Sequence, residues 1–178
     1  MGRIRQAMMD VTAGFHKADY EFVDGYLNPG EKELFLQLRQ GEILHSIAVA
    51  RKLAELIKTA FQPPLEDRER FYIIKAGLLH DLGKIHYGMN VLEKSLAVLL
   101  AKLGFDRGKR IARSRMMEIY YRHPDYSREL VLAKESFAPY PYLYKIISLH
   151  HRKIPSGLEL NLKETEVWRL LQTADDES

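Results

Sequence analysis

The stretch Leu78-Leu79-His80-Asp81-Leu82-Gly83-Lys84 closes a long apolar run that begins at Phe71. Such a run predicts a helix that is buried on most of its faces. An imidazole and a carboxylate therefore stand side by side at the end of a buried helix. Burying either group without a partner costs a few kcal/mol, and an unpaired ion costs more. A metal cation removes this cost, because His80 offers a neutral nitrogen and Asp81 an oxygen that can bridge two ions.

Two further residues complete the stretch. Gly83 is expected to let the chain leave the helix, and Lys84 places a positive charge beside the His-Asp pair. Taken alone, one His-Asp pair is weak evidence for a metal, because an aspartate often only orients a core histidine. The rest of the chain decides between these two interpretations.

The composition is typical of one globular domain. The chain has 178 residues, of which 46% are hydrophobic, and it contains no cysteine. The lack of cysteine excludes disulfides, thiolate ligands and a cysteine nucleophile, and it is consistent with a reducing compartment. No apolar run reaches the ~20 residues of a membrane span, and the N-terminal residues lack the apolar stretch of a signal peptide. We therefore expect a cytoplasmic protein that does not bind a membrane.

The charge pattern gives no clear indication of nucleic-acid binding. The formal net charge is +3, which is too small to argue for that function. Basic residues cluster at Lys109, Arg110, Arg113 and Arg115. Such a cluster is usually a solvated helix face and less often a phosphate-binding rim. Arg113 and Arg115 are therefore weaker candidates for substrate binding.

Apolar periodicity predicts an all-α fold of about seven to nine helices. The clearest amphipathic helix covers residues 42–58, where apolar side chains share one arc at ~100° per residue. A cap pattern, Asn161 with Glu164, predicts the start of the last helix. Glu66 and Asp67 favour the start of the buried helix that contains the apolar run 71–79. The other expected helices cover residues 4–24, 31–39, 91–103, 109–121, 124–136 and 142–150.

Candidate metal ligands lie at helix ends or at the edge of an apolar arc. Pro124 is expected at the first position of a helix, which places His123 at the cap of that helix. His45 is predicted to be half buried. A helical bundle can bring such positions into one cleft, and ligands without sulfur suit Mn, Fe, Zn, Co or Ni. The candidates are His45, His80, Asp81, His123, His150, His151 and Asp175.

The pattern resembles the HD-domain metal-dependent phosphohydrolases. Their signature H…HD…D matches His45, His80-Asp81 and Asp175, and the stretch that ends at Lys84 has the HDxGK form. The resemblance covers about residues 31–176. It implies an HD-domain helical bundle over residues 31–178, preceded by an N-terminal helical extension over residues 1–30. It also implies a first metal site formed by His45, His80, Asp81 and Asp175.

One branch of that family adds three histidines and holds two metals, as in the HD-GYP cyclic-dinucleotide phosphodiesterases. The added positions match His123, His150 and His151. By resemblance, Asp81 would bridge to a second site with His123 and His150, and His151 is a further candidate there. After His151 the chain departs from HD-GYP, because it has no Gly-Tyr-Pro segment, so a cyclic dinucleotide is not carried over as substrate. The match is closer to small stand-alone bacterial HD proteins.

The resemblance implies a hydrolase with a binuclear site, filled by two divalent transition metal ions (Mn, Fe, Ni, Co or Zn). A hydroxide held between the ions would attack the phosphorus of a phosphate ester. Asp81 would bridge the ions and Lys84 would hold a phosphate oxygen, which makes both candidates for the catalytic machinery. The expected partner is a small phosphorylated molecule, in the first place a nucleotide phosphodiester or monoester. The type of ester, the metal and the oligomeric state remain open.

Two other functions also remain open. Di-iron oxygenases that act on inositol and phosphonates share the fold and a similar ligand set, so oxygen-dependent turnover with iron would distinguish them. A non-catalytic signalling module is the third reading, although an intact ligand set argues against it. His16 and His86 fall outside the pattern.

Overall fold

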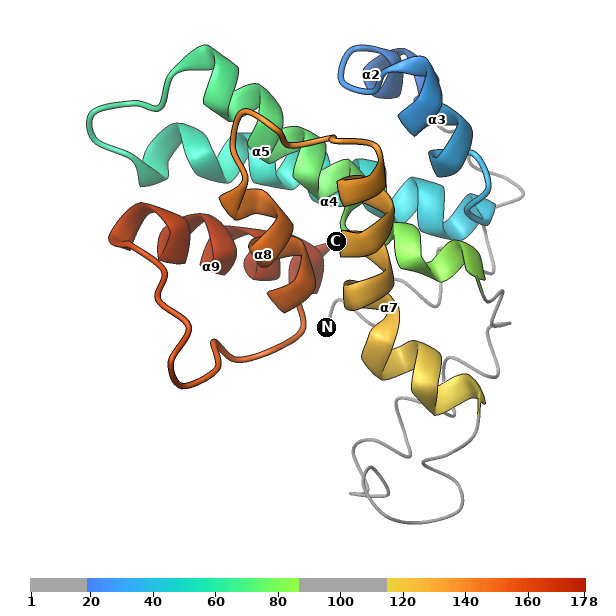
Figure 1. Cartoon of the computed structure of the whole chain (residues 1–178). Helices are drawn as coiled ribbons and strands as arrows, with labels where there is room; N and C mark the ends of the chain where they lie inside the picture. Colours follow the sequence, from blue (N-terminus) through green and yellow to red (C-terminus); the bar gives the residue numbers. More distant parts are fainter. Residues whose placement is uncertain (1–18, 87–114) are drawn as a thin grey trace.

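The computed structural model describes residues 19–86 and 115–178 (Figure 1). These residues form α-helices and no β-strand, so the predicted all-α fold is confirmed. The expected helix 91–103 lies outside the described residues. So do residues 1–18, and the N-terminal extension therefore stays a prediction. The helices are α2 (Tyr20–Asp24), α3 (Pro29–Phe35), α4 (Gln40–Ala60), α5 (Asp67–Leu79), the 3₁₀ helix η2 (Leu82–His86), α7 (Arg115–Ala133), α8 (Tyr142–Leu149) and α9 (Leu162–Glu177).

The core is centred on α4 and α5, which lie along each other (Figure 1). Gly77 of α5 allows this close approach, because a Cβ there would lie 3.0 Å from the Cα of Ala50 on α4. Leu53 of α4 and Ile73 and Leu78 of α5 are fully buried. The apolar run thus forms a buried helix, as predicted, and it delivers its last residues into the interior.

Helices α8 and α9 complete the core around this pair. α9 packs against α4, and α8 contacts both α7 and α9. The predicted cap of α9 is present: the Glu164 amide donates to Asn161 Oδ1 (2.9 Å), and the Asn161 amide donates to Glu164 Oε2 (3.1 Å). The first turn of α9 is therefore held in place, and its far end carries Asp175 to the centre of the bundle.

Helix α7 differs from the prediction at Pro124. Two helices were expected, with the second beginning at Pro124 and His123 at its cap. The structure has one helix that continues through Pro124, so His123 lies within it. Proline inside a helix lacks the N–H that would bond to the carbonyl four residues earlier, which here belongs to Tyr120. Arg152 donates from outside the helix to the neighbouring main-chain oxygen of Tyr121 (2.8 Å).

Helix α3 begins earlier than expected and is shorter. Residues Asn28-Pro29-Gly30 were interpreted as a turn before a helix over 31–39. Instead Asn28 caps the helix, which runs from Pro29 to Phe35, with Glu31 completing a capping box. Proline at the first helical position loses no helical hydrogen bond, and this explains the early start.

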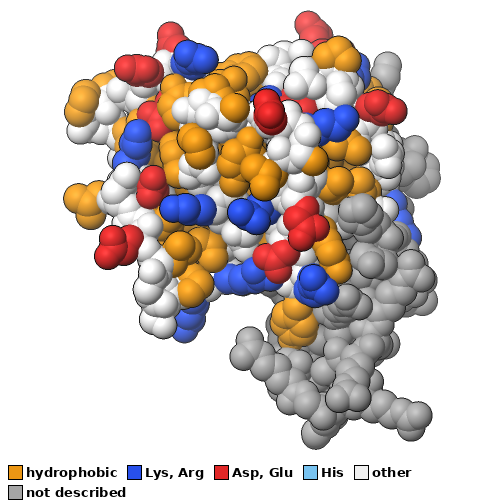
Figure 2. Space-filling model, in the orientation of Figure 1, with side chains coloured by type: hydrophobic (Ala, Val, Ile, Leu, Met, Phe, Trp, Pro, Cys, Tyr) orange, Lys and Arg blue, Asp and Glu red, His pale blue; other side chains and the backbone are white. Residues whose placement is uncertain are grey.

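The surface carries both signs of charge. Figure 2 shows acidic and basic side chains interspersed among apolar ones on the face drawn there. In the described part of the chain, no helix combines the length and the apolar character that crossing a membrane requires.

Candidate metal centre

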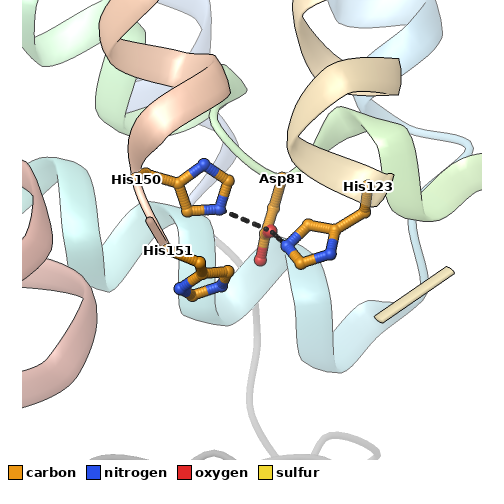
Figure 3. Close-up of side chains that lie close together, drawn as sticks. All are labelled: Asp81, His123, His150 and His151. Atoms are coloured by element: carbon orange, nitrogen blue, oxygen red, sulfur yellow. Dashed lines mark ion pairs between the residues drawn. The ribbon is translucent and has the colours of Figure 1, made fainter. Parts of the chain in front are cut away.

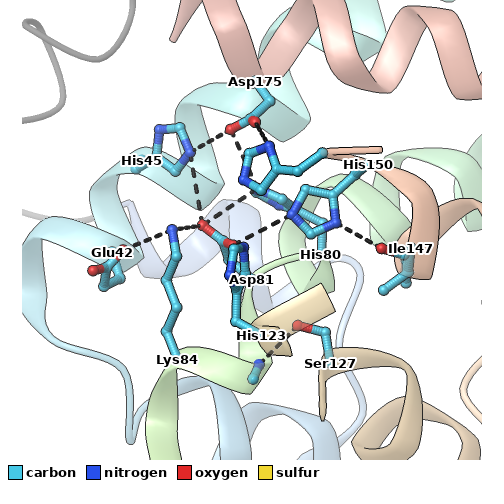
Figure 4. A network of polar contacts seen from close by, with 12 residues as sticks. Glu42, His45, His80, Asp81, Lys84, His123, Ser127, Ile147, His150 and Asp175 are labelled. Carbon is cyan, nitrogen blue, oxygen red and sulfur yellow. Dashed lines mark hydrogen bonds and ion pairs between the residues drawn. The ribbon is translucent and has the colours of Figure 1, made fainter. Parts of the chain in front are cut away.

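Five helices bring the candidate ligands to one place inside the bundle (Figure 4). His45 comes from α4, His80 and Asp81 from the end of α5, and His123 from α7. His150 and His151 follow α8, and Asp175 lies near the end of α9. His45, His80, Asp81, His123 and His150 are each at most 3% exposed. The prediction that His45 is half buried is therefore wrong, because α5 and α9 both cover its face of α4.

One oxygen of Asp81 faces the histidines of α7 and α8 (Figure 3). Asp81 Oδ1 lies 3.3 Å from His123 Nε2 and 3.6 Å from His150 Nε2. His151 lies beside them, with its ring centroid 5.0 Å from that of His123. Four residues on this side each offer one ligand atom, and these atoms lie within 4.8 Å of one another. We call them the second cluster: Asp81, His123, His150 and His151.

The other oxygen of Asp81 faces the histidines of α4 and α5. Asp81 Oδ2 lies 3.5 Å from His80 Nε2 and 3.9 Å from His45 Nε2. His45, His80 and Asp81 form the first cluster, whose ligand atoms also lie within 4.8 Å of one another. The Asp81 carboxylate therefore belongs to both clusters, with a different oxygen directed at each.

Asp175 adjoins the first cluster and reaches the second. Its Oδ1 lies 2.8 Å from His45 Nε2 and 3.5 Å from His80 Nε2 (Figure 4). Its Oδ2 lies 3.4 Å from His151 Nδ1. The C-terminal end of α9 thus places a second carboxylate across the same pair of clusters.

Two histidines are oriented by the helices that they terminate. His80 Nδ1 donates to the Gly77 carbonyl (2.8 Å), and His150 Nδ1 donates to the Ile147 carbonyl (2.6 Å). A carbonyl oxygen can only accept, so the proton of each neutral ring is on Nδ1. Each Nε2 then presents a lone pair towards Asp81, which is how metal-binding histidines are usually oriented.

The centre contains buried polar atoms without a hydrogen-bond partner. They include Nε2 of His80, Nε2 of His150 and Oδ1 of Asp81. Leaving such a group unsatisfied costs ~1–3 kcal/mol. Imidazole nitrogens and a carboxylate oxygen that face one another in the interior are suitable ligands for a divalent transition metal. The residues present therefore fit a metal ion.

The local electrostatics keep Asp81 and His150 in the protonation states that metals need. Burial alone would raise the pKa of Asp81, but Lys84 and His80 hold the pKa of this carboxyl well below its usual value. Burial lowers the pKa of His150 to about 4, despite the nearby Asp81 carboxylate. At neutral pH Asp81 is therefore ionised and His150 is neutral.

Lys84 lies beside the shared carboxylate, as its position in the sequence suggested. Its ammonium group forms an ion pair with Asp81 Oδ2 and lies 3.5 Å from Glu42 Oε2, and the side chain is 15% exposed. Burial lowers the pKa of Lys84, but the charges of Asp81 and Glu42 raise it more, so the amine stays protonated. Sequence reasoning missed Glu42, although it precedes His45 by three residues on one helix face.

Gly83 has a different role from the one expected. It was interpreted as the residue that lets the chain leave the helix, but it does not have a positive φ. A Cβ at Gly83 would lie 2.2 Å from the main-chain oxygen of His123 and 2.7 Å from the amide nitrogen of Ser127. The absence of a side chain therefore lets the stretch after Asp81 pack directly against α7, next to His123.

One face of α9 holds the His150-His151 turn. Trp168 Nε1 donates to the Leu149 carbonyl (3.1 Å), and Gln172 Nε2 donates to the Arg152 carbonyl (3.2 Å). Trp168, Gln172 and Asp175 follow at i, i+4 and i+7, so they share a helix face. Sequence reasoning missed Trp168 and Gln172, and this helical spacing back from Asp175 was the available signal.

Four residues named from the sequence lie wholly or partly outside the described part of the chain. Arg113 and His16 lie outside the described residues. Arg115 begins α7 and His86 ends η2, but their side chains are likewise outside the described part of the chain.

A scan against protein-family models matches the HD domain over residues 43–177. No curated protein matches the chain, and no solved structure does. The matched range contains every candidate ligand from His45 to Asp175, and HD domains are commonly metal-dependent hydrolases. Because the match extends over well more than half of the sequence and contains both buried clusters, the chain belongs to the HD-domain family.

Proposed function

We propose that this chain is a metal-dependent phosphohydrolase with a two-ion centre that cleaves a phosphate ester of a small molecule, in the first place a nucleotide. One observation carries the proposal. The two oxygens of the buried Asp81 face two different groups of histidines, at 3.3–3.6 Å on one side and 3.5–3.9 Å on the other. A carboxylate in this position is suited to bridge two ions.

The first ion would be held by the first cluster together with Asp175, and the second ion by the second cluster. Divalent ions in such a pair lower the pKa of a bound water and neutralise negative charge on phosphoryl oxygens. This His-rich arrangement supports the likeness to the two-metal branch of the family. Burial of the ligands excludes bulk water, which strengthens every charge interaction inside the centre.

The substrate would approach from the side of His151. The side chain of His151 is 28% exposed, whereas those of His45, His80, Asp81 and His150 are at most 1% exposed. Lys84, 15% exposed and protonated, would hold a phosphoryl oxygen at the Asp81 side. The described part of the chain thus offers a phosphorylated ligand an accessible edge at His151 and the ammonium group of Lys84.

The test combines metal analysis with a substrate panel. Elemental analysis of the purified protein should give two ions per chain. At least one member of a substrate panel should then be hydrolysed, at the same rate with and without oxygen. The panel consists of bis(p-nitrophenyl) phosphate, p-nitrophenyl phosphate and a set of cyclic and linear nucleotides. Asp81→Asn is the matched negative control, because it keeps the size of the side chain and removes its charge.

Three results would contradict the proposal. One ion per chain would remove the two-ion centre. Turnover that needs iron and oxygen would favour the di-iron oxygenase, since the same nitrogen and carboxylate ligands suit iron. Two bound ions without any turnover of the panel would favour a non-catalytic module.

A further inference from the structure

Arg152 connects the three helices that surround the second cluster. It directly follows His150-His151 at the end of α8. Its guanidinium group donates from Nη1 to Asp125 Oδ1 (2.7 Å) and from Nη2 to Asp125 Oδ2 (2.6 Å). Nη2 also donates to the Tyr121 carbonyl on α7 (2.8 Å), and the Arg152 carbonyl accepts from Gln172 on α9 (3.2 Å).

The contacts to α7 enclose the position of His123. Tyr121 precedes His123 by two residues, and Asp125 follows it by two. Between them lies Pro124, which has no N–H to donate to the preceding turn. This turn has therefore lost one of its helical hydrogen bonds, and Arg152 adds three bonds from outside the helix to residues on either side of His123. A paired guanidinium and carboxylate fix orientation as well as distance.

The second cluster depends on the spacing that these bonds set. His123 belongs to α7, whereas His150 and His151 follow α8. His123 Nε2 and His150 Nε2 approach the same oxygen of Asp81 at 3.3 and 3.6 Å. Metal–ligand distances tolerate only about ±0.2 Å, so a small shift of α7 relative to α8 is enough to spoil coordination.

Apart from the shared Asp81, the groups proposed to hold the first ion lie outside this connection. They are His45, His80 and Asp175, which come from α4, the end of α5 and α9. Within the described residues, all the hydrogen bonds that the Arg152 guanidinium donates go to α7. Loss of the guanidinium therefore leaves the supports of the first cluster in place.

We propose that Arg152 is a positioning residue of the second cluster: it fixes His123 relative to His150-His151 and so sets the affinity for the ion at that cluster. The inference rests on the two-ion centre proposed above. Arg152 itself touches neither substrate nor metal in this scheme.

The test compares stepwise Mn²⁺ binding in the wild type and in Arg152→Gln. Calorimetric titration should show a Kd for the second ion that is roughly 10–100-fold higher in the variant, as is typical when a group supporting a ligand is lost. The Kd of the first ion should not change. At the same Mn²⁺ concentration, the wild type should give the electron paramagnetic resonance signal of a coupled Mn²⁺ pair. Arg152→Gln should give the signal of an isolated ion. Arg169→Gln is the matched control, because Arg169 makes a two-point ion pair with Glu166 on the surface of α9.

A charge exchange adds a rescue experiment. Arg152→Asp and Asp125→Arg should each weaken the second ion, and the double variant should recover at least part of the loss. Asp125→Asn removes the same contact from the α7 side and serves if Arg152→Gln fails to fold. Equal weakening of both ions would assign Arg152 a general structural role and overturn the inference, and unchanged affinities would overturn it too. One ion in the wild type would instead show that the two-ion centre itself is wrong.

Discussion

The amide of Gly83 donates a hydrogen bond of 2.8 Å to Ser127 Oγ, which is buried in α7. This bond ties the stretch after Asp81 to the turn of α7 that follows His123. The donor and acceptor are 44 residues apart in sequence. The relationship explains how one ligand of the second cluster is brought to the carboxylate at the end of α5.

Gly83→Ala should destabilise the protein by about 1–3 kcal/mol, because the new Cβ would overlap the main chain of α7. Chemical denaturation of the metal-free protein measures this loss. Gly30→Ala is the matched control, since the nearest atom to its Cβ, Lys134 Nζ, would lie 3.5 Å away at the end of a flexible side chain. If Gly83→Ala lost no more free energy of unfolding than Gly30→Ala, the close packing at Gly83 would have no energetic importance.

Asp81→Ala should abolish tight binding of both ions, because each cluster loses its carboxylate oxygen. Equilibrium dialysis followed by elemental analysis gives the stoichiometry directly. Retention of two tightly bound ions would contradict the bridging assignment. The fold of the variant is checked by circular dichroism, since the chain also loses the partner of Lys84.

His123→Ala should remove only the second ion. The first cluster keeps all of its residues, so the first ion should bind with the wild-type affinity. The same dialysis experiment counts the remaining ions. Two ions in the variant would place His123 outside the metal centre, and none would mean that the clusters are not separable.

Metal binding should tighten as the pH rises and should release protons. Burial lowers the pKa of His80, but the carboxylates of Asp81 and Asp175 raise it more, so the net shift is above the ordinary 6.5. The metal-free imidazole therefore keeps its second proton to a higher pH than free histidine, and this proton must leave before Nε2 can coordinate. Affinity should rise as the pH increases from 6.5 through the raised pKa. Calorimetry in buffers with different ionisation heats measures the protons, and proton uptake would contradict the prediction.

Lys84→Met should destabilise the metal-free protein by about 3 kcal/mol, because the buried Asp81 carboxylate loses its ammonium partner. The same change should increase the affinity for a divalent ion, since no ammonium group competes for Asp81 Oδ2. Thermal unfolding with and without Mn²⁺ measures both effects. Lys52→Met is the control, because the Lys52–Glu177 pair is exposed and is worth only ~0–1 kcal/mol. If Lys84→Met and Lys52→Met changed the unfolding temperature equally, both with and without Mn²⁺, Lys84 would not balance the charge of the centre.

Local chemistry explains why so much of the fold could be predicted. Apolar side chains at helical spacing define α4, α5 and α9, and Asn161 with Glu164 marks where α9 begins. The error at α7 has a local cause as well. Pro124 favours a helix start when its neighbours alone are considered, whereas the contacts that Arg152 makes on both sides of it come from a residue far along the chain.

The fold class and the candidate metal ligands could be predicted without coordinates, because helical periodicity and side-chain chemistry are both local properties. Only the packing of the helices shows which oxygen of Asp81 faces which histidines, that Gly83 packs on α7, that Glu42 lies beside Lys84, and that Arg152 pairs with Asp125. Those relationships depend on distances between helices that are set by packing of the whole core. A difference of a few ångströms, which no local pattern encodes, separates a shared carboxylate from an ordinary buried ion pair.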